Sequence, residues 1–264
     1  MKVIVTGSKG FIGKKLKSAL EKVYEVIEVD FNDCWMFLSH FDDWDEVETI
    51  YHLGAISDTT ADNPIIVNQY NVTFTLSLFQ IAIAKGIPVK YASSASVYGN
   101  GNGPINFYAI SKLTVDIWVE DHLQEFSHIQ GFRFFNVYGD GEEDKLKRNQ
   151  SSPVTKFIHQ AKTQGKITLF EGSNHSLRDF VCVDDVINVM MNNDKPSGVY
   201  DLGTSNPISF LKVGKIISEC YNVPIETIPF PKHLEGKYQY HTCANTEWNH
   251  EFISVESYVK NSLG

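Results

Sequence analysis

The strongest constraint on the fold of this chain is a regular alternation of short apolar runs with helical patterns. Each β-branched, apolar run is followed by a stretch in which apolar residues recur with helical spacing. This alternation is typical of βαβ units on a parallel sheet, so we expect an α/β fold with a doubly wound sheet. The expected strands are Lys2–Thr6, Val23–Val29, Thr49–Leu53, Val89–Ala92 and Ile129–Phe135, and the expected helices are Lys14–Lys22, Ile65–Ala84 and Tyr108–Gln124.

A glycine-rich turn joins the first expected strand to the first expected helix. Gly7, Gly10 and Gly13 form the pattern TGxxGxxG, which permits a tight turn and close backbone approach to a pyrophosphate at the helix N-terminus. Asp30 ends the next strand, where it can accept hydrogen bonds from ribose hydroxyls or act as an ordinary turn former. The context predicts a Rossmann-type dinucleotide site.

Two further strand ends carry candidate site residues. Leu53, Gly54 and Ala55 follow the third strand, where small residues suit a chain passing close to a cofactor, and His52 beside them is expected to be a packed, hydrogen-bonded histidine. The spacing of Tyr108 and Lys112, YxxxK, places both on one helix face, where the ammonium is expected to lower the pKa of the phenol. Such a tyrosine can take a proton from an alcohol, to which Ser94 at the end of its strand can hydrogen-bond. Without a catalytic role, Tyr108 and Lys112 are incidental residues of a surface helix.

The second half of the chain has a less regular pattern. A polar segment, 140–150, precedes the helices expected at Val154–Gln164, Val181–Met191 and Phe210–Tyr221 and the strands expected at Ile167–Phe170 and Gly198–Leu202. Residues 1–142, with 179–205 returning, are predicted to form the dinucleotide-binding domain, and residues 143–264 mainly form a smaller α/β substrate-binding lobe. No repeat or low-complexity linker is present, so the lobes are expected to pack closely.

Charge and cysteine usage exclude several classes of function. The formal net charge of −9 disfavours nucleic-acid and acidic-membrane partners, which require a basic face. No apolar run approaches the length of a membrane helix, and the first residues enter a strand-like run without a secretory signal. Four scattered cysteines without a CxxC pair indicate no zinc site and fit a reducing cytoplasm, where we expect the protein to remain.

The ordered motifs resemble those of the extended short-chain dehydrogenases/reductases, the NAD-dependent epimerase/dehydratase family. These motifs are TGxxGxxG, the loop at 52–55, the SSxxVYG segment at 93–99, YxxxK, and the segment GFRFFNVYG at 131–139. The segments at 169–173, 178–181, 228–231 and 236–239 are similar to those of one subgroup, the ADP-glycero-manno-heptose 6-epimerases. The resemblance implies a nucleotide-sugar substrate, which is epimerised through transient oxidation by a tightly bound nicotinamide cofactor.

The resemblance also implies further site residues. The cofactor set extends to Phe11, Ile12, Phe31, Ser57, Asn68, Lys112 and Val137, and the substrate set comprises Ser94, Asn136, Asn149, Phe170, Glu171, Gly172, Ser173, Arg178 and Tyr238. A second catalytic base on the opposite face of the sugar corresponds to Lys145 by distance from Asn136. It corresponds to Lys147, slightly favoured, if the following residues 149–152 are aligned instead.

Two alternatives remain open at the level of function. A UDP-sugar 4-epimerase or another nucleotide-sugar epimerase or dehydratase shares most of these motifs, although Ala95 and Ser96 replace the acid pair that a dehydratase needs. A catalytically silent dinucleotide-binding regulator has no need of the Ser–Tyr–Lys set. Members of the family usually pair through the helices expected here at 65–84 and 108–124, which predicts a homo-oligomer.

The acidic segment after the glycine turn favours NAD over NADP. No lysine or arginine lies between Lys22 and Lys85, whereas that span carries eleven acids. A 2′-phosphate beside Asp30 would therefore meet like charge, unless Lys9 or Lys14 reached it. The same region is short, because only 18 residues separate Asp30 from Thr49, where the family usually has a further strand and helix.

Overall fold

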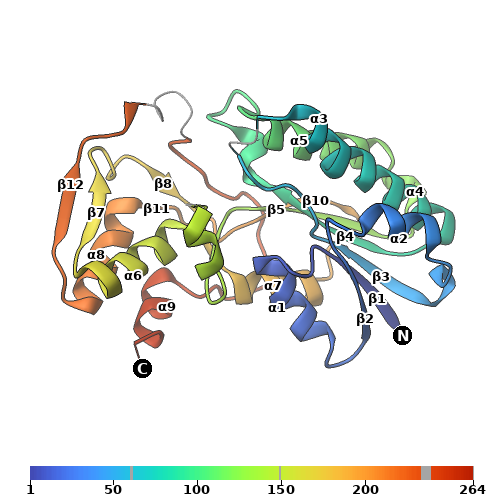
Figure 1. Ribbon diagram of the computed structural model, residues 1–264, viewed down its shortest axis with the longest axis horizontal. Helices are drawn as coiled ribbons and strands as arrows, with labels where there is room; N and C mark the ends of the chain where they lie inside the picture. The colour runs from blue at the N-terminus through green and yellow to red at the C-terminus, as the bar shows by residue number, and fades with distance from the viewer. Residues whose placement is uncertain (60–61, 149, 233–238, 264) are drawn as a thin grey trace. The chain divides into compact units, whose positions relative to one another are not determined.

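The computed structural model describes residues 1–59, 62–148, 150–232 and 239–263. The chain divides into two compact units (Figure 1): residues 1–134 with 190–200, and residues 135–189 with 201–264. The boundary expected after residue 142 thus falls after Phe134. The reason is that strand β6 (Asn136–Tyr138) pairs with β9 (Phe180–Cys182), which also belongs to the second unit.

A six-stranded sheet forms the centre of the first unit. Its order is β10-β5-β4-β3-β1-β2, and β1 pairs in parallel with both β2 and β3, β3 with β4, and β4 with β5. The strands are β1 (Lys2–Thr6), β2 (Glu25–Val29), β3 (Val47–His52), β4 (Val89–Ser94), β5 (Ile129–Phe134) and β10 (Gly198–Leu202). The strand order reverses between β1 and β3. Open parallel sheets bind ligands outside the carboxyl ends of the strands at such a reversal.

Helices cover both faces of this sheet (Figure 1). Helix α1 (Phe11–Leu20) lies on one face, and α3 (Pro64–Asn68), α4 (Phe74–Lys85) and α5 (Phe107–Asp121) lie on the other. A π-helical turn, Gln69–Thr73, joins α3 to α4, so the expected continuous helix over 65–84 is interrupted. Single π-turns inside α-helices are frequent at functional sites.

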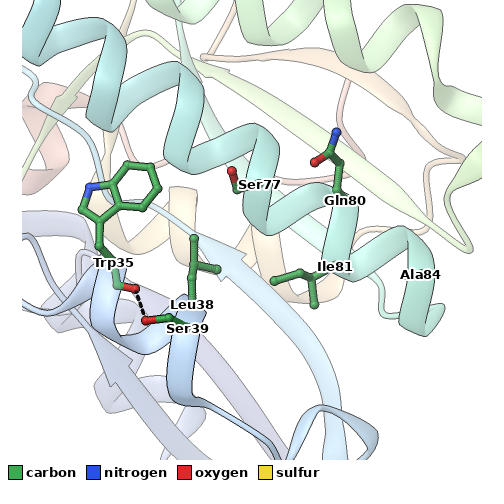
Figure 2. A pocket seen from close by; sticks show the side chains of 7 residues that line it. All are labelled: Trp35, Leu38, Ser39, Ser77, Gln80, Ile81 and Ala84. Atoms are coloured by element: carbon green, nitrogen blue, oxygen red, sulfur yellow. Dashed lines mark hydrogen bonds between the residues drawn. The ribbon is translucent and has the colours of Figure 1, made fainter.

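The segment between β2 and β3 contains a short helix in place of a further strand. Helix α2 (Cys34–His40) and a 3₁₀ turn (Trp44–Glu46) fill it, and Phe37, Phe41 and Trp44 form an aromatic cluster. Helices α2 and α4 border a surface groove of about 500 Å³ (Figure 2). Its lining residues are Trp35, Leu38, Ser39, Ser77, Gln80, Ile81 and Ala84, and none of them is among the predicted site residues.

Three two-stranded ladders and several helices build the second unit. The parallel pairs are β6 with β9 and β7 (Ile167–Phe170) with β12 (Ile225–Ile228), and β8 (Leu177–Arg178) pairs with β11 (Ile208–Ser209) antiparallel. Helices α6 (Pro153–Gln164), α8 (Phe210–Tyr221) and α9 (Val255–Asn261) pack with β7 and β9 around one apolar core. The helix expected from Val181 begins at Val183 (α7, Val183–Asn192), because Val181 belongs to β9.

Candidate functional site

The glycine turn closes tightly between β1 and α1. Gly7 has φ +70°, and a Cβ there would lie 2.8 Å from the Cα of Gly54. A Cβ on Gly13 would lie 2.0 Å from the carbonyl oxygen of Gly7. Helix α1 begins at Phe11 behind the Gly10 N-cap, so its first backbone amides face the turn. This cradle excludes side chains at Gly7 and Gly13 and fits a pyrophosphate at a helix N-terminus.

Acidic groups gather at the end of β2, beside this turn. Asp30 accepts hydrogen bonds from the Ser8 hydroxyl at 2.8 Å and from the Lys9 amide at 3.3 Å. The Ser8 hydroxyl also lies 2.8 Å from a carboxylate oxygen of Glu28, and the Lys9 ammonium lies 3.6 Å from Asp30. Phe31 is half exposed and stacks on Tyr70, with ring centroids 4.1 Å apart.

The loop after β3 lies against the glycine turn. The amide of Gly54 donates to the hydroxyl of Thr6 at 2.9 Å, and the amide of Leu53 donates to the backbone carbonyl of Thr6 at 3.1 Å. Leu53, Gly54 and Ala55 are partly buried, and Ser57 is exposed. His52 is buried and hydrogen-bonded through both ring nitrogens, which confirms the packed role expected for it.

Sequence reasoning chose Asn68 and missed Asn71. Asn68 is exposed at the end of α3, whereas Asn71 is buried in the π-helical turn. The Asn71 amide bonds both backbone groups of Ile56, at 2.8 and 3.0 Å, and donates to the Ser111 hydroxyl at 3.0 Å. The available signal was that Asn71 lies on an expected helix beside the apolar residues Val72 and Phe74, because a buried amide needs hydrogen-bond partners.

Ser94, Tyr108 and Lys112 meet at the carboxyl end of β4. Ser94 is the last residue of β4 and hydrogen-bonds with the partly exposed Tyr108, which is in the first turn of α5. Lys112 is buried one turn further along α5 and donates to the Ala92 carbonyl at 2.6 Å. Burial lowers the pKa of Lys112 to about 8.

The expected lowering of the Tyr108 pKa is wrong for this structure. Burial raises the pKa of Tyr108, the Ser94 hydrogen bond opposes that rise, and the Asp116 carboxylate adds to it. The Lys112 ammonium, which the YxxxK spacing suggested as the cause of a lowered pKa, donates to the Ala92 carbonyl and is not among the groups that shift the pKa of Tyr108 here.

A buried acid beneath this triad also escaped the sequence analysis. Asp116, one turn beyond Lys112, is wholly buried and accepts hydrogen bonds from Tyr91 at 2.9 Å and from Ser93 and Arg133 at 2.8 Å. Arg133 also donates to the exposed Tyr98 at 3.0 Å. The paired Asp116 raises the pKa of the Arg133 guanidinium. An acid on the apolar face of an expected helix was the signal for this network.

The predicted substrate residues of the second unit lie on several of its elements. Asn136 and Val137 are on β6, where both are partly buried and the Asn136 amide donates to the Asp179 carbonyl at 3.0 Å. Arg178 is buried on β8, donates to the Leu177 carbonyl at 3.1 Å and lies over the Phe210 ring at 5.6 Å.

Phe170 ends β7 and begins the turn that was predicted to contact the nucleotide. Ser173 donates its amide to the Phe170 carbonyl at 3.1 Å, and Gly172 has φ +79°. Glu171 and Gly172 are exposed, and Ser173 is partly buried. This geometry makes the segment a tight, accessible turn at the end of a strand.

The two candidate second bases differ in burial. Both lie in the 3₁₀ segment Glu143–Arg148, but Lys145 is partly buried, with a pKa lowered by burial, whereas Lys147 is exposed. The segment is tied down by the buried Glu142, which accepts hydrogen bonds from the amide and hydroxyl of Ser152 at 2.7 Å. Two other predicted residues, Asn149 and Tyr238, lie outside the described residues.

Within the described ranges, no group of histidine, cysteine, aspartate or glutamate residues is arranged to hold a metal ion. The same residues include no helix that is both long and apolar enough to cross a membrane.

Comparison with known proteins gives full-length relatives. The chain is 33% identical over 305 aligned residues to the ADP-L-glycero-D-manno-heptose-6-epimerase of Brachyspira hyodysenteriae, covering 98% of this chain and 95% of the relative. It is 33% identical over 311 residues to the same enzyme of Alkalilimnicola ehrlichii, covering 99% and 96%. Both alignments are longer than this chain of 264 residues, so they contain gaps.

Solved structures agree with the observed fold. The ADP-L-glycero-D-manno-heptose-6-epimerase of Helicobacter pylori matches with a TM-score of 0.77 and 26% identity, covering 99% of this chain and 94% of that one. A UDP-glucose 4-epimerase of Thermotoga maritima matches with a TM-score of 0.83 and 21% identity, covering 98% and 96%, which shows the fold alone. The model of the NAD-dependent epimerase/dehydratase family matches residues 3–203, and this chain belongs to that family.

Proposed function

We propose that this protein epimerises a nucleotide-activated sugar, ADP-glycero-manno-heptose at C6, by transient oxidation with a retained NAD. The observation that carries the proposal is the meeting of Tyr108, Ser94 and Lys112 at the carboxyl end of β4. The full-length similarity to two ADP-L-glycero-D-manno-heptose-6-epimerases supports the choice of sugar.

The first unit fits a dinucleotide. Gly7 and Gly13 leave no room for side chains in the turn before α1, which suits the pyrophosphate. Asp30 suits the adenosine ribose hydroxyls, and Gly54 and Ala55 border the same turn from β3. When bound, NAD supplies the acceptor and donor of the two electrons that the transient oxidation requires.

The chain's own residues manage the proton. Tyr108 takes the proton from the sugar hydroxyl, and Ser94 donates a hydrogen bond to the same oxygen. Burial raises the pKa of Tyr108 in this structure, so proton removal requires a cation that stabilises the phenolate. Lys112, one turn along α5, can supply it, because its ammonium has two further N–H donors beside the one that bonds the Ala92 carbonyl. Residues of the second unit recognise the rest of the substrate. The planar guanidinium of the buried Arg178 donates parallel hydrogen bonds to the diphosphate, and Asn136 hydrogen-bonds the sugar.

Conversion of the sugar by the purified protein tests this function. ADP-glycero-manno-heptose and UDP-glucose are incubated with NAD-loaded protein, and the epimers are resolved by proton NMR. Tyr108→Phe should lower turnover by about 10²–10⁴-fold while NAD still binds. Tyr24→Phe is the matched control, because Tyr24 precedes β2 at the opposite end of the sheet. Conversion of UDP-glucose alone would identify a 4-epimerase, and unchanged sugars with bound NAD would indicate a silent regulator.

We propose Lys145 as the second base. A lysine acts as a base only after losing its proton, and burial lowers the pKa of Lys145, whereas Lys147 is exposed. Lys145→Met should abolish epimerisation without preventing NAD binding, and Lys147→Met is the matched control two residues away in the same segment. The assignment is overturned if Lys147→Met alone abolishes turnover, and the two-base mechanism fails if neither variant affects it.

NAD is proposed over NADP because of the acids at the end of β2. Glu28 and Asp30 share the Ser8 hydroxyl, so a 2′-phosphate beside them meets two carboxylates, whose ammonium partners are Lys17 for Glu28 and Lys9 for Asp30. Titration of the stripped protein should give a lower dissociation constant for NAD than for NADP. Asp30→Asn should reduce the ratio of the NADP constant to the NAD constant by about tenfold. Tighter binding of NADP to the unmodified chain would contradict this choice.

A homo-oligomer is proposed from the exposed face of α5. Phe107, Ile110 and Ile117 are 42%, 47% and 50% exposed and share one side of that helix. An exposed apolar face of this kind is a common oligomer contact. Light scattering should give at least the mass of a dimer, and Ile110→Asp should shift the protein toward the monomer; a monomeric unmodified chain would refute this.

A further inference from the structure

A buried row of polar side chains connects three elements of the first unit. Thr6 ends β1, His52 ends β3 and Thr75 is on α4, and each is 2% exposed. The Thr6 hydroxyl lies 2.7 Å from His52 Nδ1, and the Thr75 hydroxyl lies 2.8 Å from His52 Nε2. The proposed reaction uses none of these three groups.

Counting donors fixes the direction of every hydrogen bond in the row. Thr75 gives its only hydroxyl proton to the Asn71 carbonyl at 2.8 Å, so His52 must donate from Nε2 to the Thr75 oxygen. Burial lowers the pKa of His52 to about 3, so the ring is neutral and its Nδ1 is an acceptor. Thr6 therefore donates to Nδ1, and its oxygen accepts the Gly54 amide proton at 2.9 Å.

Both ends of the row hold the loop after β3, which borders the proposed dinucleotide. At one end it holds Gly54, which packs so closely on Gly7 that a Cβ on Gly7 would lie 2.8 Å from the Gly54 Cα. At the other end it holds the backbone of Asn71, whose side chain bonds Ile56 of the same loop. The loop is thus held at two positions, two residues apart.

The same row extends to the helix that carries the catalytic pair. The Asn71 amide donates to the Ser111 hydroxyl at 3.0 Å, and that hydroxyl donates to the backbone carbonyl of Tyr108 at 2.7 Å. A displacement of Gly54 would therefore also displace the glycine turn on one side and the first turn of α5 on the other.

We infer that His52, as the Nε2-protonated neutral tautomer, is a positioning residue that sets the Gly54 loop and the glycine turn for NAD binding. The inference rests on the proposed function only in requiring that NAD binds this turn. His52 touches neither sugar nor cofactor in this scheme. His52 acts through Thr6. When His52 Nδ1 accepts the hydroxyl proton of Thr6, the lone pairs of the Thr6 oxygen face the Gly54 amide and accept its proton.

Three substitutions separate the two ring nitrogens. His52→Asn places an amide oxygen near the Nδ1 position and can still accept from Thr6, whereas His52→Gln reaches only the Nε2 position. His52→Phe removes both polar atoms and keeps a ring, which can retain the edge contacts with Phe74 and Phe79 at about 6 Å between centroids. NAD affinity is measured by titration of stripped protein, and the folded state of each variant is verified by near-UV circular dichroism.

We expect His52→Phe and His52→Gln to weaken NAD binding about tenfold and His52→Asn to stay within about threefold of the unmodified chain. Thr6→Val should weaken binding as much as His52→Phe, and the double variant should be no weaker than either, because both interrupt one row. Additive losses, or equal losses in all three His52 variants, would overturn the inference. An unmodified chain that binds no NAD would instead refute the proposed function.

The tautomer itself has a direct readout. In protein labelled with ¹⁵N at histidine, one ring should show a protonated Nε2 and a bare Nδ1 that do not change between pH 5 and 8, and this signal should vanish in His52→Phe. A His52 ring that is protonated at Nδ1, or that titrates in this range, would refute the inferred direction of the row.

Discussion

Replacing Arg133 with methionine leaves a buried carboxylate without its guanidinium partner. Asp116 is fully buried, and the Arg133 side chain is only 16% exposed, with Nε 2.8 Å from a carboxylate oxygen. After the change Asp116 keeps the hydroxyls of Tyr91 and Ser93, which are neutral donors. Breaking a buried pair in this way costs about 3–5 kcal/mol of folding free energy. Urea unfolding followed by tryptophan fluorescence measures the loss as a fall in midpoint at constant slope.

A matched surface pair provides the control. Lys85 and Asp45 also lie 2.8 Å apart, but their side chains are 38% and 83% exposed. Lys85→Met should cost less than about 1 kcal/mol, because water screens an exposed pair.

Adding Asp116→Asn to Arg133→Met should recover part of the stability, because the neutral amide removes the unpaired charge. The reasoning is refuted if Arg133→Met costs no more than Lys85→Met, or if the double variant is less stable than Arg133→Met alone.

Three further predictions concern single positions in the first unit. The pKa of His52 is lowered to about 3, so on acidification the unfolded chain binds a proton there before the folded chain does. The free energy of unfolding should therefore fall as pH drops below about 6.5, by up to about 1.4 kcal/mol per pH unit. Urea unfolding from pH 7 to 4 should show a weaker pH dependence of this free energy for His52→Phe, and an equal pH dependence would contradict the prediction. Gly13→Ala should weaken NAD binding far more than Gly10→Ala in titrations, because its Cβ would lie 2.0 Å rather than 3.2 Å from the Gly7 oxygen; similar losses would refute the steric argument. Asn106 caps α5, so Asn106→Ala should lower the thermal midpoint by an amount equivalent to about 1 kcal/mol, and Asn106→Ser should restore most of it.

The elements that sequence patterns predicted best are those with a clear period and clear ends. The strands Lys2–Thr6, Ile167–Phe170 and Gly198–Leu202 and the helix Phe210–Tyr221 have the expected bounds. Helix α2 escaped prediction because its seven residues are mostly apolar and show no helical period. Strands β8 and β11 have two residues each, too few for an alternating pattern to appear.

The candidate site divides in a similar way. The glycine turn and the Tyr108–Lys112 spacing are local patterns, and the structure places those residues at the carboxyl ends of β1 and β4. The partners of Asn71 and Asp116 come from residues 15 to 40 positions away, so no short pattern marks them. The direction of the Tyr108 pKa shift depends on burial and on the side chains of Ser94 and Asp116, which the YxxxK spacing does not determine.

The short segment after β2 also determines what the sheet presents to other molecules. Among the described strands, β2 pairs only with β1, so one of its sides carries backbone groups that no further strand of this sheet covers. Unpaired edges of this kind can recruit a strand from a second molecule and start aggregation. Glu25 and Glu28 are exposed on β2, and like charges on an approaching copy would repel them. Of these two acids only Glu28 also lies beside the proposed ribose site, where it accepts from the Ser8 hydroxyl, so this strand borders the site with one end and carries charge along a free sheet edge.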